Sequence, residues 1–127
     1  MSKGIIKGLS HIGIFVKDMD KSIDFYKGLG FTLDNRISIH VELAFMSAGT
    51  CLIELIEQKD VTRSAGVVDH IAVEVDDIEA FVARAKENDI EIDASGIVSR
   101  DILGGIRHLF FEGLDGERLE LFEHTGR

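Results

Sequence analysis

Two histidines and two glutamates recur in matching sequence contexts. His11 begins the segment HIGIFVKDMD and His70 begins HIAVEVDDIE, while Glu54 lies in IELIE and Glu120 lies in LELFE. Imidazole nitrogens and carboxylate oxygens are ligands for Ni, Co, Mn, Fe and Zn, and two carboxylates balance the charge of a divalent ion. The spacing therefore predicts one divalent metal ion per site, held by His11, Glu54, His70 and Glu120.

The repetition indicates a duplicated supersecondary unit, and the local patterns predict its elements. Alternation of apolar and polar residues predicts strands at 9–16 and 67–75. Helices should follow, capped by Asp18 in the first unit and by Asp76 or Asp77 in the second. Each unit then has the order β-α-β-β-β, and the polar segment 58–66 joins them. The remaining strands are expected at 31–38, 41–47, 51–57, 90–98, 105–112 and 117–123.

The alternation also assigns residues to the two sides of each sheet. One helix must cover one side, so the Ile/Val triplets that follow each histidine pack under the helices and the histidines face the other side. Glu54 and Glu120 share that second side by the same period. We therefore expect an α+β fold in which two tandem modules, about 7–58 and 66–124, form a curved-sheet metal-binding cleft within a single domain, 1–127.

The expected turns place further residues in the cleft. A four-residue turn at 113–116 would pair Leu109 with Glu120 and put Arg107 beside Phe122. An Arg there would bind a carboxylate or phosphate, which predicts an anionic substrate. Alternatively, Arg107 could pair with Glu74 or another carboxylate of the wall, and a turn one residue longer or shorter would present His108 instead. A turn at 47–50 adds the apolar walls, so the predicted substrate-binding residues are Arg107, Phe15, Phe45, Leu109 and Phe122, with Val41 and Leu43 nearby.

The bulk composition limits the partners and the compartment. The chain has 127 residues, of which 45% are hydrophobic, and a net charge of −9. An acidic surface disfavours nucleic acid and anionic membranes as partners. The sequence has no signal-peptide pattern and no apolar stretch of membrane-spanning length, so we expect a cytoplasmic protein. The single Cys51 is expected to be a small buried residue in a strand.

Four segments, at 11–31, 53–55, 69–78 and 115–121, resemble the vicinal oxygen chelate superfamily, which includes glyoxalase I, bleomycin resistance proteins and dioxygenases. The family's ligand positions would fall on His11, Glu54, His70 and Glu120, and a glutamate at the second position is most similar to glyoxalase I. The resemblance implies a metal-dependent isomerase or lyase of the lactoylglutathione lyase type. Its substrate would be a small chelating oxygenated compound, anionic or thiol-conjugated. A metal-stabilised enediolate would form, with Glu120 or Glu54 as the base.

Two other functions stay open. The same fold occurs in small-molecule-binding or sequestering resistance proteins. It also occurs in Fe(II) ring-cleaving dioxygenases, whose triad would be His11, His70 and Glu120, with Glu54 at a position that oxygen chemistry needs free. Relatives form dimers and the edge strands need partners, so a homodimer is expected. The site could lie within one chain or between modules of two chains.

Overall fold

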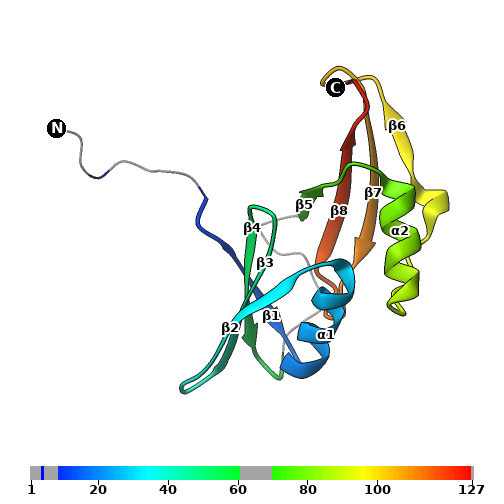
Figure 1. Ribbon diagram of the computed structural model, residues 1–127. Coiled ribbons are helices and arrows are strands. Elements are labelled where there is room, and N and C mark those ends of the chain that lie inside the picture. The colour runs from blue at the N-terminus through cyan, green and yellow to red at the C-terminus, as the bar shows by residue number, and fades with distance from the viewer. Residues whose placement is uncertain (1–3, 5–8, 61–69, 127) are drawn as a thin grey trace.

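The computed structural model, which describes residues 4, 9–60 and 70–126, contains two similar modules (Figure 1). Each has one four-stranded sheet and one α-helix. This confirms the α+β fold with two tandem β-α-β-β-β modules. The first module consists of β1 (Ile12–Val16), α1 (Met19–Leu29), β2 (Thr32–Ser38), β3 (Glu42–Ala48) and β4 (Cys51–Glu57). The second consists of β5 (Ile71–Glu74), α2 (Ile78–Glu87), the 3-10 turn η1 (Ala94–Gly96), β6 (Val98–Arg100), β7 (Ile106–Glu112) and β8 (Arg118–His124).

Both sheets have the same topology. Their strand orders are β1-β4-β3-β2 and β5-β8-β7-β6. In each, the first strand is parallel to the last strand of its module, and the other pairings are antiparallel. This pairing brings the beginning of each module beside its end, although many residues separate them in the chain.

The aspartates and second glutamates of the repeated segments hold the helices. Asp18 and Asp77 are the N-caps of α1 and α2, each accepting a hydrogen bond from a backbone N–H of the first turn. Glu57, at the end of β4, accepts from the first N–H of α1 at 3.0 Å, and Glu123 in β8 accepts from that of α2 at 2.9 Å. These carboxylates satisfy N–H groups that a helix cannot pair internally, and their negative charge stabilises the positive N-terminal end of the helix dipole.

The two modules contact each other through their helix-bearing sides. One hydrophobic cluster contains buried residues of both, such as Ile14 and Leu121. Tyr26 of α1 donates its hydroxyl proton to Glu117 in the second module at 2.7 Å. Burial, with Glu117 adding to it, raises the pKa of Tyr26 well above its ordinary value. A cavity of about 600 Å³ also lies among helix-side residues of both modules. Among the described residues the opposite sides stay open, since Phe15 there is 53% exposed and the side chains of His11 and His70 are 37% and 33% exposed.

The predicted strand at 90–98 is wrong. Residues 90–93 form no strand, η1 follows, and a strand begins only at Val98. The Asp93 side chain accepts hydrogen bonds from the backbone N–H and the hydroxyl of Ser95, at 3.0 and 2.7 Å. Such local bonds of Asp and Ser compete with a strand ladder.

Other predicted strands are correct in type but differ at their ends. The strand predicted at 9–16 begins at Ile12, and that at 117–123 spans Arg118–His124. Residues 61–66 of the predicted linker and 67–69 of the predicted strand 67–75 lie outside the described residues. Within the described part of the chain, the helices are too short and polar to cross a membrane.

Candidate metal centre

The first module places His11 and Glu54 side by side. In the parallel ladder Gly13 lies opposite Glu54, and His11 is the residue directly before β1. Its Nε2 is 3.4 Å from Oε1 of Glu54. Phe45 lies opposite Glu54 on β3, and its ring meets the His11 ring edge-to-face with 5.7 Å between centroids. The alternation of the strands therefore brings an imidazole, a carboxylate and an aromatic ring to one side of the sheet.

The second module repeats this arrangement. Ala72 lies opposite Glu120, and Nε2 of His70 is 3.2 Å from Oε1 of Glu120. Phe110 lies opposite Glu120 on β7, and its ring meets the His70 ring edge-to-face at 5.3 Å. Glu120 is the more buried of the two carboxylates, because its side chain is 9% exposed while that of Glu54 is 19% exposed.

These separations fit ligands of a divalent ion. Imidazole nitrogen and carboxylate oxygen bind zinc at about 2.1 Å, so neighbouring ligands of tetrahedral or octahedral ions lie about 3.0–3.4 Å apart. The two observed N–O distances, 3.4 and 3.2 Å, agree with that range. Each His–Glu pair can therefore supply two neighbouring ligands, and a complete site needs both pairs.

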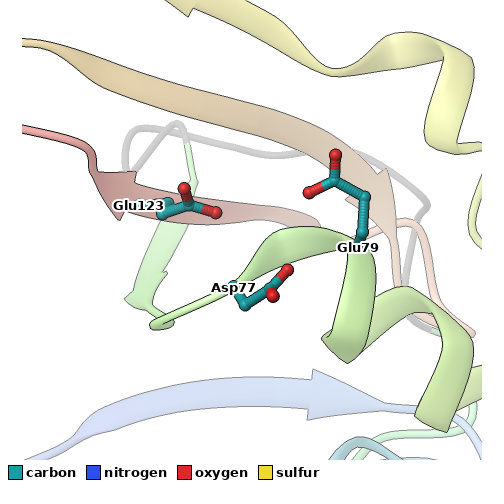
Figure 2. A group of neighbouring side chains, drawn as sticks. All are labelled: Asp77, Glu79 and Glu123. Carbon is teal, nitrogen blue, oxygen red and sulfur yellow. The ribbon is translucent and has the colours of Figure 1, made fainter.

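The two pairs are not gathered into one cluster. Among the described residues, the group of three or more possible ligand atoms lying within 4.8 Å of one another is Asp77, Glu79 and Glu123 (Figure 2). The contact between the modules explains this. The helix-bearing sides of the two sheets meet, so the sides that carry the His–Glu pairs do not.

The acidic group in Figure 2 has a structural explanation. Asp77 and Glu123 hold the beginning of α2, and Arg107 contacts both Glu79 and Glu123. The first module has a similar ion pair, in which Arg36 lies 2.7 Å from Asp20 at the beginning of α1. The group is therefore a helix-capping arrangement in which an arginine pairs with two of the three carboxylates, and we do not interpret it as a metal site.

We call the side of each sheet that carries its His–Glu pair the metal side. The prediction that Arg107 and Leu109 lie on this side is wrong. The β7–β8 turn spans residues 113–117, one residue more than expected, since Glu112 lies opposite Arg118. Three hydrogen bonds hold this turn. They run from the Gly113 N–H to the Glu117 carbonyl, from the Gly116 N–H to the Gly113 carbonyl and from the Asp115 N–H to the Glu117 carboxylate.

A shift of one residue moves every side chain of β7 to the other side of the sheet. Arg107 now lies opposite Glu123 and pairs with Glu79, whose hydrogen bond raises the pKa of the guanidinium. Leu109 is buried on the helix-bearing side of the sheet, next to Gly96 of η1, with 2% of its surface exposed. His108 and Phe110 take their places beside Glu120.

The predicted walls of the first module keep their side despite a different register. Ala48 lies opposite Cys51, so the turn has two residues instead of four and Phe45, rather than Leu43, lies opposite Glu54. An even change preserves the alternation, and Leu43 and Phe45 still share the side of Glu54. Phe15, opposite Ile56, and Phe122, opposite Glu74, also lie on the metal sides of their sheets, whereas Val41 precedes β3.

One cation on the metal side was missed. Arg118 lies two residues before Glu120 on β8, and its guanidinium carbon is 4.0 Å from the centre of the Phe110 ring. The alternation along β8 is enough to place it with Glu120 and Phe122. That signal was present in the sequence and did not depend on the turn.

Comparisons with known proteins show which sequences and structures this chain resembles. The model of the Glyoxalase/Bleomycin resistance protein/Dioxygenase superfamily matches residues 8–121. YwbC of Bacillus subtilis (strain 168) is 35% identical over 92% of this chain and 98% of its own length. The metallothiol transferase FosB of Staphylococcus epidermidis is 34% identical over 96% of this chain and 86% of its own length. A FosX variant from Listeria monocytogenes, a fosfomycin resistance protein complexed with Mn(II) and 1S,2S-dihydroxypropylphosphonic acid, has a TM-score of 0.75, covers 95% of both chains and is 22% identical.

Proposed function

Because the chain belongs to the Glyoxalase/Bleomycin resistance protein/Dioxygenase superfamily, we propose that it is a divalent-metal-dependent enzyme acting on a small oxygenated anion. The duplicated His–Glu pairs, with N–O separations of 3.4 and 3.2 Å, support this most directly. The relation to FosB favours a resistance-type reaction, in which a thiol or water is added to the substrate, over the glyoxalase I reaction. The FosX complex makes Mn(II) the first ion to test.

We further propose that the site forms between two copies of the chain. The modules of one chain meet through their helix-bearing sides, and His11, Phe15 and His70 lie at the open sides. Strands β1 and β5 are edge strands whose outer backbone groups need a partner. A homodimer in which the first module of one copy faces the second module of the other would unite all four ligands.

The remaining residues of the metal side have separate tasks in this proposal. A bound divalent ion would polarise a substrate oxygen. The Arg118 guanidinium would pair with the anionic group of the substrate in two parallel hydrogen bonds. The rings of Phe45, Phe110 and Phe122 exclude water from the charged groups, which strengthens these interactions.

Glu54 favours a second candidate, an isomerase of the glyoxalase I type. It lies beside His11 and completes a set of two imidazoles and two carboxylates. A carboxylate in this position could take a proton from one carbon and return it to the next. The same residue disfavours a dioxygenase, since it occupies a position that oxygen would need.

Metal loading followed by a substrate panel tests the proposal. Protein purified without chelator is loaded with Mn(II), Ni(II), Co(II) or Zn(II), and bound metal is measured. Fosfomycin is then supplied with a thiol or with water alone, and methylglyoxal hemithioacetal is supplied separately. We expect bound metal and turnover of fosfomycin. Turnover of the hemithioacetal alone would select the isomerase, tight binding without turnover would select sequestration, and no bound metal under any condition would exclude the enzyme.

Two variants connect this experiment to the residues. His70→Ala should abolish metal binding, because it removes one of the two imidazole ligands. His40→Ala, at an exposed position between β2 and β3, is the matched control and should retain the metal.

A further inference from the structure

Glu120 is held by two imidazoles, one on each carboxylate oxygen. His70 Nε2 is 3.2 Å from Oε1, and His108 Nδ1 is 2.9 Å from Oε2. A carboxylate only accepts hydrogen bonds, so His108 carries its proton on Nδ1 and donates it. A metal ion bound to His70 Nε2 would therefore bind Oε1, which lies beside that nitrogen, while Oε2 stays with His108.

The His108 side chain is largely buried on the side of β7 that it shares with the His70–Glu120 pair. That side chain is 16% exposed, and its Nε2 is buried with no hydrogen-bond partner. The Phe110 ring meets the His108 ring edge-to-face at 5.5 Å and the His70 ring at 5.3 Å. The hydrogen bond that links His108 to the His70–Glu120 pair is therefore the one from its Nδ1 to Glu120.

The first module is an internal control for this contact. Phe45 and Phe110 occupy equivalent positions, opposite Glu54 and Glu120. Two residues earlier on the same strands, the first module has Leu43 where the second has His108. Leucine has no donor, so Glu54 lacks the hydrogen bond that His108 gives to Glu120. The two otherwise matching carboxylates therefore differ in how firmly they are held.

We infer that His108 is a positioning residue that fixes Glu120 as a permanent one-oxygen metal ligand, while Glu54, beside Leu43, is the carboxylate free to turn toward the substrate and take its proton. The inference rests on the proposed metal site and deepens it. Partners of ligating groups orient them and commonly change metal affinity by about 10–100-fold. The duplicated fold thus holds two chemically identical carboxylates in unequal states.

The test exchanges the two positions and measures Mn(II) affinity of the full chain. His108→Leu gives the second module the residue of the first, and we expect the Kd for Mn(II) to rise about tenfold or more. His108→Asn keeps a donor near Oε2 and should restore the affinity to within about threefold of the unchanged protein. Leu43→His should keep or tighten Mn(II) binding and lower kcat, since it would fix Glu54 in the same way.

Metal-free stability separates this role from a general structural one. His108→Leu should still unfold cooperatively in urea, at a somewhat lower concentration than the unchanged protein because the buried Oε2 of Glu120 loses its donor, so weaker Mn(II) binding by the folded variant is not a loss of folding. Equal Mn(II) affinity of His108→Leu and the unchanged protein would overturn the inference. So would an Asn variant as weak as the Leu variant, or a Leu43→His variant with undiminished kcat. If the unchanged protein binds no metal at all, the proposed function itself fails.

Discussion

At the scale of residues, the two glutamates in each of the segments IELIE and LELFE do different work because they lie three positions apart on a strand. An odd separation puts them on opposite sides of the sheet. Glu54 and Glu120 lie beside histidines, whereas Glu57 and Glu123 bond the first N–H groups of the helices. Each repeated segment therefore supplies one candidate metal ligand and one helix-capping carboxylate.

Arg118 and Arg107 form a matched pair of tests for the anion-binding side. Arg118→Ala should raise KM for an anionic substrate about tenfold or more, because a hydrogen bond to a charged group is worth roughly 1.5–3 kcal/mol. Arg107→Ala removes an ion pair with Glu79 on the helix side, so KM should stay unchanged. Steady-state kinetics with the active compound of the panel measures both. A change in KM for Arg107→Ala alone would refute the assignment.

At the scale of elements, turn length decides which side chains reach the site. The turn at 49–50 differs from the expected turn by two residues and preserves the side of Phe45. The turn at 113–117 differs by one residue, so Arg107 moves to the helix side and His108 to the metal side. Because side chains alternate with a period of two, an odd change in turn length moves them to the other side of the sheet and an even change does not.

Removing a helix-capping carboxylate should cost stability without affecting the metal. Glu57→Ala and Glu123→Ala each leave the first N–H of a helix without its acceptor, at a cost of about 1 kcal/mol. Urea unfolding of the metal-free protein measures this loss. Both residues face the helices, so Mn(II) content after loading should remain that of the unchanged protein. A Glu123→Ala variant that is folded but no longer binds metal would show that Glu123 belongs to the metal site.

At the scale of the whole molecule, the two modules meet by their helix-bearing sides, and the two His–Glu pairs in the described part of one chain are not gathered into one cluster. Tyr26 and Glu117 hold the modules in this arrangement. A second copy would supply the missing pair to each open side, and two copies would form two equivalent sites. Assembly and metal binding are therefore expected to depend on each other.

Mixing two inactive variants tests whether the site lies between chains. One variant carries His11→Ala in the first module, and the other carries His70→Ala in the second. If sites form between modules of two chains, a mixed dimer has one site with both substitutions and one with none. Refolding the variants together should then restore tight Mn(II) binding to some of the dimers, measured by metal content and by light scattering.

The outcome differs if each site lies within one chain. Every chain then has one damaged ligand, and the mixture would bind no more tightly than the separate variants. A monomer at micromolar concentration that binds Mn(II) tightly would also contradict the proposed assembly. Mixing either variant with His40→Ala is the control, since that pairing supplies an undamaged copy of every ligand.

Sequence alone determined the local features of this protein. The strand period placed His11 with Glu54 and His70 with Glu120 on the sides away from the helices, and Asp18 and Asp77 marked the beginnings of those helices. These depend on neighbours within a few residues or on a repeated pattern. The tertiary structure decided the register across the 113–117 turn and the sides through which the modules meet. The contact between the modules depends on bonds between distant residues, such as Tyr26 with Glu117, which no local pattern in the chain specifies. The register depends on the hydrogen bonds that close the turn one residue later than its residue types suggested.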